Sequence, residues 1–508
     1  MTATEPLHPT TPGPARCVMV LGTTSGAGKS WLTTALCRWY AQQGLRVAPF
    51  KAQNMSNNAR VVGDAEGLHG GEIGSAQYFQ ALAARATPDV RMNPMLLKPE
   101  RDTHSQVVLM GQVSAELTAM PWRGRSERVW PAITQALDSL RASHDVVVIE
   151  GAGSPAEINL HASDIVNMRV ARHAGAQCVL VTDIDRGGAF AHLYGTWALL
   201  PADEQALIKG FVLNKFRGDA ALLAPPPQML EDRTGVPTIA TLPMWWQHGL
   251  PEEDGIFDAR TSAGAGPIHT RIAIVAYPRI SNLDEFQPLK NIPGVAVSWA
   301  RSASDLIAAD WVILPGSKHT SGDLAWLRAQ GLDAAIAAHA QAGGRVLGIC
   351  GGLQMLGEAL IDPHGIDGNA PGLGLLPVVT LFEPAKTVRH RQAVFAPLAG
   401  PWAPLSGVAL QGYEIHHGQT ARHPAMAAGG DVAREVLQGG LGWQSANGQV
   451  LGLYLHGMFE DPAVLQALFG ARAPTLDTVF DGLADFVDAH IGHDALMALL
   501  QVQGKNGA

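Results

Sequence analysis

A single cysteine, Cys350, stands where an apolar, strand-forming segment meets a glycine-rich helix start. It lies in the sequence GICGGLQMLG at residues 348–357. A tight turn between a strand and a helix lifts a side chain clear of the sheet, and a helix N-terminus favours a thiolate. The two glycines that follow the cysteine let a substrate carbonyl approach closely. This pattern predicts that Cys350 is a nucleophile.

A thiolate nucleophile needs a general base and hydrogen-bond donors that stabilise an oxyanion. His456 follows an apolar segment, so it lies at a predicted strand end and is our candidate for the base. Gly316 also follows a predicted strand, and its N–H forms a candidate oxyanion pair with that of Gly351. Glu414 and His416 are polar residues in an apolar setting, which either line the same site or belong to the ordinary surface.

Residues 22–30 (GTTSGAGKS) form a second motif, a glycine-rich turn between a predicted strand and a predicted helix. This is the context of a phosphate-binding loop, although Thr23 stands where the common G-x-x-x-x-G-K-[ST] pattern has its first glycine. In such a loop, backbone N–H groups surround an anion, the lysine faces the outer phosphates and the hydroxyl can ligate Mg²⁺. We therefore predict ATP and Mg²⁺ as cofactors, bound by Gly22, Thr23, Gly26, Gly28, Lys29 and Ser30.

Polar side chains follow other strand-forming segments, at the edge where parallel α/β sheets bind ligands. Glu150 ends an apolar segment in the manner of a Walker-B acid, and Asp64 lies in a polar loop. Both are candidate Mg²⁺ ligands, with helix capping as the alternative for Glu150 and a solvated loop acid for Asp64. Asn214 follows a further strand and is predicted to contact the nucleotide base.

Two polar clusters in the same kind of position predict where a substrate binds. The first is residues 50–58 (FKAQNMSNN), whose amides suit a substrate rich in amides and carboxylates, and the second is residues 182–188 (TDIDRGG). The alternatives are a capped polar loop for the first cluster and a helix cap with a salt bridge for the second. The side chains assigned to the substrate are Lys51, Gln53, Asn54, Asn57, Asp185 and Arg186.

The composition fits an α/β enzyme of more than one domain. The chain has 508 residues, of which 47% are hydrophobic and 16% charged. Its net charge of -9 argues against nucleic acid as a partner. The four cysteines are far apart, which indicates neither a disulfide framework nor a zinc site. No segment has eighteen successive apolar residues, and the N-terminus lacks a signal pattern. We therefore expect a cytoplasmic protein without a membrane partner, and the sequence leaves its oligomeric state open.

Apolar and amphipathic segments alternate along the chain, which predicts two doubly wound parallel sheets. The alternation lapses between residues 251 and 270, where acidic residues give way to Ser, Gly and Pro, and it starts again at residue 271. A last helix, at about residues 484–502, is expected to pack rather than act. The predicted domains are a flexible tail (1–15), a P-loop domain (16–250), a linker (251–270), a second α/β domain (271–472) and a C-terminal helical extension (473–508).

Taken together, these motifs resemble the cobyric acid synthase family, glutamine-hydrolysing enzymes of cobalamin biosynthesis. The resemblance runs from about Cys17 to Gly470. It rests most on the long motifs at residues 50–58, 150–160 (EGAGSPAEINL), 183–188 and 214–219 (NKFRGD), together with the cysteine and histidine motifs of the second half.

The resemblance implies a P-loop, dethiobiotin-synthetase-like amidoligase domain joined to a class I, triad-type glutamine amidotransferase domain. It implies that Cys350 attacks the side-chain amide of glutamine, that His456 relays protons, and that the ammonia meets a carboxylate activated by ATP·Mg²⁺. The implied substrate is adenosylcobyrinic acid a,c-diamide, amidated at carboxylates b, d, e and g to adenosylcobyric acid. One position departs from the pattern: triad glutaminases carry Glu two residues after the histidine, where this chain has Met458 and then Glu460. The third triad member is left open.

Two other functions compete with this interpretation. Cobyrinic acid a,c-diamide synthase pairs the same domains and differs in the carboxylates it amidates, and the segment at residues 50–58 favours the first assignment. A nucleotide-switched binding protein with an inactive glutaminase-like domain belongs to another class. The presence of both Cys350 and His456 argues against it.

Overall fold

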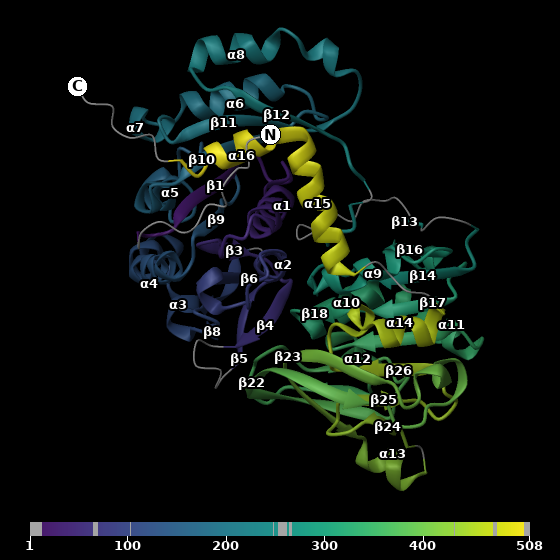
Figure 1. The fold of residues 1–508 in the computed structure, drawn as a ribbon. Helices are drawn as coiled ribbons and strands as arrows, with labels where there is room; N and C mark the ends of the chain where they lie inside the picture. Colours follow the sequence, from purple (N-terminus) through teal and green to yellow (C-terminus); the bar gives the residue numbers. More distant parts are fainter. Residues whose placement is uncertain are drawn as a thin grey trace.

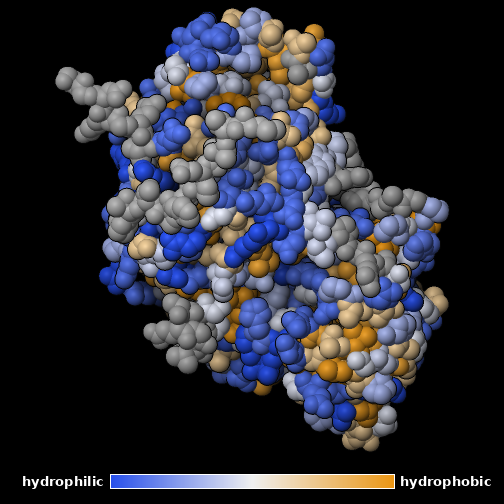
Figure 2. Space-filling view, in the orientation of Figure 1, coloured by the Kyte–Doolittle hydropathy of each residue, from blue (hydrophilic) through white to orange (hydrophobic). Residues whose placement is uncertain are grey.

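The protein consists of two α/β domains, each built on its own sheet, as the sequence predicts (Figure 1). The computed structural model describes residues 13–63, 70–101, 103–246, 248–251, 262–263, 267–430, 432–470 and 475–501. Within these residues, no helix combines the length and the apolar character that a membrane span requires. On the face drawn in Figure 2, hydrophilic residues line the boundary between the two domains.

The first domain is built on a six-stranded sheet with the order β12-β11-β10-β1-β9-β2, in which every neighbouring pair is parallel. The P-loop connects the central strand β1 to α1, so it lies at the carboxyl edge of the sheet. The six strands contain the six apolar segments that predict them. They are β1 (Arg16–Gly22), β2 (Val47–Phe50), β9 (Val146–Glu150), β10 (Gln177–Asp183), β11 (Ile208–Phe216) and β12 (Thr238–Pro243).

Helices cover both faces of this sheet, which explains why the central residues of its strands are largely apolar. Successive residues of a strand point to opposite faces. In β1, Met19 and Leu21 pack against one helical layer, and Val18 and Val20 pack against the other. The first layer contains α4 (Trp122–Ser143), α5 (Met168–Ala174) and α6 (Ala189–Ala198), and the second contains α1 (Lys29–Gln42) and α2 (Ser75–Ala83).

The C-terminal helices return to the first domain and join the layer of α1 (yellow in Figure 1). Phe480 and Leu483 of α15 (Leu476–Ile491) lie in the same core as α1 and β1. Arg38 of α1 donates hydrogen bonds to Asp477, at 2.9 Å, and to Asp481, at 2.7 Å. This segment therefore packs, as predicted.

The prediction of one helix at about residues 484–502 is wrong in its extent. The structure has two helices, α15 and α16 (His493–Ala498), and α15 begins at Leu476. They are separated by Gly492, whose φ of 87° lies in the left-handed region that glycine adopts without strain. The 3.6-residue periodicity continues across the break, which is why the sequence pattern alone suggests one helix.

The second domain has a mixed eight-stranded sheet with the order β13-β16-β14-β17-β19-β26-β25-β24. Its five central strands are parallel: β16 (Val295–Ala300), β14 (Thr270–Val275), β17 (Trp311–Leu314), β19 (Arg345–Ile349) and β26 (Val450–Leu453). Strands β13 (Ser262–Ala263) and β25 (Gly442–Gln444) run antiparallel to this core, and β24 (Arg434–Leu437) pairs antiparallel with β25. Strand β13 falls within the predicted linker at 251–270, most of which lies outside the described residues, as does most of the predicted tail.

A long hairpin of β22 (Val378–Val394) and β23 (Ala409–Arg422) extends from the second domain to the first (Figure 1). It meets β4 (Ala59–Gly63) and β5 (Gly70–Gly74), where Val61 and Leu96 pack against Tyr413 and Ile415. Charged pairs also cross the boundary, among them Lys318 with Glu100 at 2.8 Å and Lys386 with Glu72. The hairpin is not among the elements that the sequence pattern predicts.

Smaller elements complete the two domains. In the first domain these are β3 (Gln53–Met55), β6 (Met95–Arg101), β7 (His104–Leu109), β8 (Gln112–Val113), α3 (Ala115–Ala119), α7 (Ala202–Gln205) and α8 (Pro226–Thr234). In the second they are β15 (Ile280–Ser281), α9 (Gln287–Lys290), β18 (Gly316–Ser317), α10 (Thr320–Ala329), α11 (Leu332–Gln341), α12 (Gly351–Leu356), β20 (Ala359–Ile361), β21 (Ala370–Pro371), α13 (Pro424–Ala428) and α14 (Pro462–Phe469).

Candidate active sites

The predicted phosphate loop has the conformation that an anion-binding loop requires. Gly26 and Gly28 have φ values of 72° and 101°, and a Cβ atom on Gly28 would lie 2.1 Å from Nδ2 of Asn214. Only glycine fits there. The Nζ atom of Lys29 donates to the carbonyl oxygens of Thr24, at 3.0 Å, and Gly153, at 3.2 Å. The lysine therefore bends back across the loop, where it can meet phosphate oxygens.

A buried carboxylate, Glu150, lies beside this loop. Its Oε1 atom accepts hydrogen bonds from the Ser30 hydroxyl, at 2.7 Å, and from Nζ of Lys51, at 2.9 Å, while Oε2 accepts from Gln80. Burial alone would raise the pKa of Glu150, but the charge of Lys51 and these hydrogen bonds bring the pKa below its ordinary value. Glu150 is thus an anion next to a serine hydroxyl, and both present the oxygen ligands that Mg²⁺ prefers.

Asn214 contacts the loop through the nitrogen of its side-chain amide, while the amide oxygen binds the next residue of its own strand. Its Nδ2 atom donates to the carbonyl oxygen of Ala27, at 2.9 Å, and its Oδ1 atom accepts from the N–H of Lys215, at 2.8 Å. Lys215, which is not among the predicted site residues, donates to the carbonyl oxygen of Gly26, at 2.8 Å, and pairs with Asp183, at 3.2 Å. The neighbouring strand end therefore fixes the shape of the loop.

The remaining candidates from the cluster at 182–188 lie at the surface near this edge. Asp185 accepts a hydrogen bond from Nε of Arg217, at 2.7 Å. Arg186 lies 3.4 Å from Asp183 and keeps more than half of its side chain exposed, so it is accessible to a ligand. Asp64 lies outside the described residues.

The predicted substrate cluster at 50–58 is largely internal. Asn54 is buried and donates to Gln77, at 3.1 Å, while Asn57 donates to the carbonyl oxygen of Pro99, at 3.2 Å. Among the described residues, Oε1 of Gln53 and Oδ1 of Asn57 are buried acceptors without a hydrogen-bond partner. Such acceptors are costly unless a ligand or water binds them. The cluster thus offers two buried acceptors that no described residue satisfies.

Cys350 occupies a strained turn at the end of β19. Its φ of 52° and ψ of -107° are unusual for a residue with a side chain, which is typical of a nucleophile held on a strand-to-helix elbow. The thiol is nearly buried, and its sulfur lies 3.7 Å from the carbonyl oxygen of Ile415. The N–H of Cys350 donates to the carbonyl oxygen of Leu453, at 2.7 Å, which anchors the turn to β26.

The other predicted members of this site gather around Cys350. A Cβ atom on Gly316 would lie 3.0 Å from Cε1 of His456, and a Cβ atom on Gly351 would lie 2.7 Å from the backbone N of Ser317. The Cys350 thiol is close enough to His456 to raise the pKa of its imidazole. The structure therefore brings together the proposed nucleophile, base and oxyanion glycines from three strand ends.

Glu285 completes this arrangement, although no pattern in the sequence indicates it. Its Oε1 atom lies 3.0 Å from Nδ1 of His456, and its Oε2 atom accepts from the N–H of Gly457, at 3.1 Å. The two side chains are fully buried. Burial alone would lower the pKa of His456, but Glu285 and then Cys350 raise that pKa to about 10. The carboxylate thus fixes the imidazole with Nδ1 toward Glu285, which leaves Nε2 to exchange a proton.

Met458, which stands where triad glutaminases carry Glu, and Glu460, two residues further on, have other roles. Met458 is buried in the apolar core of the second domain. Glu460 pairs with Arg60 of the first domain. Glu285 lies 171 positions before His456 in the chain, so no spacing rule connects them.

Glu414 and His416 form a pair of their own beside the nucleophile. Their side chains are 3.0 Å apart, and Glu414 also accepts from Arg389, at 2.8 Å, and Arg391, at 3.1 Å. Although burial would raise it, these partners lower the pKa of Glu414 to about 2. The carbonyl oxygen of Ile415, between them, faces the sulfur of Cys350. The side chains of Glu414 and His416 instead bond to each other and to residues other than Cys350.

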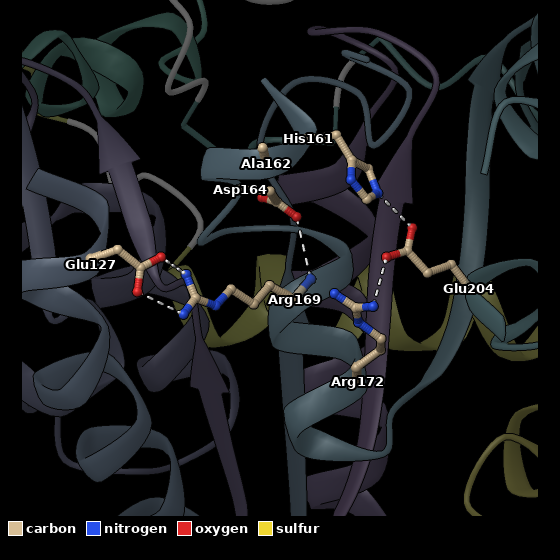
Figure 3. A pocket seen from close by; sticks show the side chains of 7 residues that line it. All are labelled: Glu127, His161, Ala162, Asp164, Arg169, Arg172 and Glu204. Carbon is tan, nitrogen blue, oxygen red and sulfur yellow. Dashed lines mark hydrogen bonds and ion pairs between the residues drawn. The ribbon is translucent and has the colours of Figure 1, made fainter. Parts of the chain in front are cut away.

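A separate pocket of about 240 Å³ lies beside α5 (Figure 3). Its charged side chains pair with one another: Arg169 with Glu127, at 2.7 Å, and His161 with Glu204, at 3.0 Å. Its lining residues are all different from the predicted site residues.

The fold and the two sites define a class of protein in which a P-loop nucleotide-binding domain is joined to a glutamine amidotransferase domain. Residues 18–246 match the family described as "CobQ/CobB/MinD/ParA nucleotide binding domain", and residues 271–464 match the "CobB/CobQ-like glutamine amidotransferase domain". The chain belongs to the cobyric acid synthase family, as its relatives show.

Two of these relatives illustrate how far the similarity extends. The cobyric acid synthase of Variovorax paradoxus (strain S110) is 76% identical over 485 residues, which cover 96% of this chain and 99% of that protein. The cobyric acid synthase of Acidovorax sp. (strain JS42) is 75% identical over 493 residues, which cover 97% of this chain and 99% of that protein. The similarity therefore includes both domains.

Proposed function

We propose that this protein uses glutamine and ATP to amidate carboxylates b, d, e and g of adenosylcobyrinic acid a,c-diamide, giving adenosylcobyric acid. The observation that carries this proposal is the presence, in one chain of this family, of a Cys350–His456–Glu285 arrangement and a phosphate loop with Lys29. A cytoplasmic location, where ATP and glutamine are supplied, fits the reaction. Residues 16–250 form the amidoligase domain, completed by the helices of 473–508, and residues 271–472 form the glutaminase.

In the glutaminase, the Cys350 thiolate attacks the side-chain carbonyl carbon of glutamine. The N–H groups of Gly316 and Gly351 stabilise the oxyanion that forms. His456, held by Glu285, gives a proton to the leaving ammonia and later takes one from the water that hydrolyses the thioester. The products are ammonia and glutamate, and the thiolate is regenerated.

In the amidoligase, the corrinoid carboxylate takes the γ-phosphoryl group of ATP to become an acyl phosphate, which ammonia then converts to an amide with release of phosphate. The Lys29 cation stabilises charge on the transferred group. Ser30 and Glu150 would hold Mg²⁺, which neutralises phosphate charge when it is bound. Among the described residues, no group of three His, Cys, Asp or Glu side chains is placed to hold a metal ion.

The decisive experiment is mass spectrometry of the product formed from adenosylcobyrinic acid a,c-diamide, glutamine and ATP·Mg²⁺. We expect stepwise amidation at four carboxylates, each step replacing one –OH with –NH₂. Amidation of cobyrinic acid at a and c instead would establish the diamide synthase. Nucleotide binding without any amidation would favour a switch protein.

The first prediction concerns Glu285. Glu285→Gln keeps the shape of the side chain but removes the negative charge and permits the wrong imidazole tautomer, so we expect kcat for glutamine hydrolysis to fall by about two to four powers of ten. Amidation with added ammonium should keep its rate, because the first domain is unchanged. Assays of both nitrogen sources on one preparation check this. A near-normal glutaminase rate would remove Glu285 from the catalytic arrangement.

The second prediction concerns the substrate cluster. Asn57 is only partly buried and has an unpartnered Oδ1 atom, whereas Asn54 is bonded inside the domain. Asn57→Ala should therefore raise KM for the corrinoid by about tenfold, because the loss of one hydrogen bond to a polar ligand weakens binding by about that factor. Basal glutaminase activity should not change. An unaltered KM would place the corrinoid elsewhere on the sheet edge.

A further inference from the structure

Arg60, in β4 of the first domain, is a buried cation, and its two ionic partners among the described residues both belong to the second domain. Its Nε atom donates to Asp284, at 2.9 Å, and its NH1 group donates to Glu460, at 2.9 Å, while NH2 contacts both acids. Only 2% of the Arg60 side chain is exposed, and Asp284 is similarly buried. Two charge-assisted contacts in a buried setting fix the relative position of the groups that make them.

These partners belong to the two chain segments that carry the imidazole and its carboxylate. Asp284 directly precedes Glu285 in a short helix, Leu283–Phe286. Glu460 ends another short helix, Met458–Glu460, which begins two residues after His456. Arg60 thus connects the segment that carries the carboxylate to the segment that carries the imidazole.

Tyr413 provides a third contact between Arg60 and the imidazole. The guanidinium of Arg60 lies 5.2 Å from the centre of the Tyr413 ring. That ring in turn stacks on His456 with a centroid distance of 5.3 Å and an angle of 22°. Tyr413 and His456 also exchange backbone hydrogen bonds, at 3.0 Å and 3.3 Å. Three segments around the imidazole therefore meet Arg60.

The first domain also binds the backbone of the same segment. Asn58 accepts a hydrogen bond from the N–H of Leu283, at 2.9 Å, and the side chain of Asn282 donates to the carbonyl oxygen of Ala59, at 2.8 Å. Residues 58–60 of the first domain and residues 282–285 of the second are thus joined by main-chain and side-chain contacts. Glu285, the carboxylate that orients the proposed base, therefore lies in the segment that these contacts hold against the first domain.

We propose that Arg60 is a positioning residue for the glutaminase, which holds Glu285 and His456 in register from the other domain, so that glutamine hydrolysis requires the nucleotide-binding domain to be docked. This inference rests on the proposed function. Without the arginine, the carboxylates of Asp284 and Glu460, on the two segments that carry Glu285 and His456, would have no guanidinium between them. A displacement of about 1 Å in a catalytic group can lower a rate by about a hundredfold.

The test compares Arg60→Gln with Lys386→Gln in the full-length protein. Lys386 also forms a buried pair across the boundary, with Glu72, but among the described residues it does not pair with the segments around His456. For Arg60→Gln we expect kcat for glutamine hydrolysis to fall by about ten- to a hundredfold, with little change in KM for glutamine and with ammonium-dependent amidation retained. Lys386→Gln should keep both activities.

Three further measurements separate positioning from general destabilisation. A cleft of about 690 Å³ borders Arg60, Tyr413 and Gly457, so added guanidinium chloride at a concentration that does not unfold the protein should partly restore kcat of Arg60→Gln. If Arg60→Gln does not fold, Asp284→Asn removes one of the two contacts and should lower kcat by a smaller factor in the same direction. Arg60→Lys keeps the positive charge but cannot contact Asp284 and Glu460 in the same way. Its kcat for glutamine hydrolysis should lie between that of the wild type and that of Arg60→Gln.

The glutaminase rates of these variants distinguish a failure of the inference from a failure of the proposed function. An unchanged kcat in Arg60→Gln or Asp284→Asn would overturn the inference, as would an equal loss in Lys386→Gln, which would mean that any weakening of the domain boundary has the same effect. A wild-type protein that does not hydrolyse glutamine would instead overturn the proposed function.

Discussion

Cys350→Ala should lower glutamine-dependent amidation by about a thousandfold or more and leave ammonium-dependent amidation intact. The loss is large because the thiolate is the atom that attacks the amide, and neither His456 nor the oxyanion glycines can replace it. The second activity persists because the acyl phosphate in the first domain needs only ammonia, whatever its source. Lys29 and Glu150, which serve that step, lie in the first domain, whereas Cys350 lies in the second.

This result is checked by measuring corrinoid amidation with glutamine and with ammonium chloride on the same preparation of the variant. The elbow has room for alanine, because the change removes one buried sulfur atom and leaves the strained backbone anchored at Leu453. The matched control is Cys178→Ala, which removes a buried thiol in β10 that belongs to neither site. Loss of both activities in folded Cys350→Ala would contradict the separation of the two sites.

Lys29→Ala should stop amidation from either nitrogen source. The lysine bends over the loop toward the place of the outer phosphates, and its charge acts in a largely buried site where little water can substitute for it. Removing such a group costs about two to three powers of ten in kcat. Because the change lies in the first domain, basal glutamine hydrolysis should continue.

The measurement is ATP-dependent amidation with saturating ammonium, together with glutaminase activity as an internal control. Lys209→Ala is a matched change of charge, because Lys209 lies at the start of β11, at the other end of that strand from Asn214. It should leave amidation unchanged. Near-normal turnover of Lys29→Ala would mean that the nucleotide binds elsewhere.

The sequence predicts those parts of the molecule that depend on local pattern. The parallel strands are apolar over most of their length because both faces are covered, so their positions agree with the structure. The turn of Cys350 and the phosphate loop are contiguous motifs whose glycines signal the backbone shape they need. His456 could be found because it lies just after such a strand.

Other parts could not be predicted because they depend on contacts between distant segments. Nothing near Glu285 in the sequence distinguishes it from an ordinary surface acid, and only the fold brings it to His456. The same holds for Arg60, whose partners are 224 and 400 positions away. The hairpin of β22 and β23 was missed because its strands are long and partly exposed, with a polar pattern that resembles a loop.

The return of α15 and α16 to the first domain has a consequence for how the chain is made. A ribosome makes β1 and α1 well before α15 and α16, which supply Asp488 and the carbonyl oxygen of Leu496 as hydrogen-bond acceptors for Trp39 and Tyr40 of α1. The glutaminase domain is translated between these two events. Cutting the gene at the linker would therefore not isolate the ATP-dependent half, since the apolar side of α1 would lack its cover. A separately expressed amidoligase would need the last helices joined to residue 250 by a short connection.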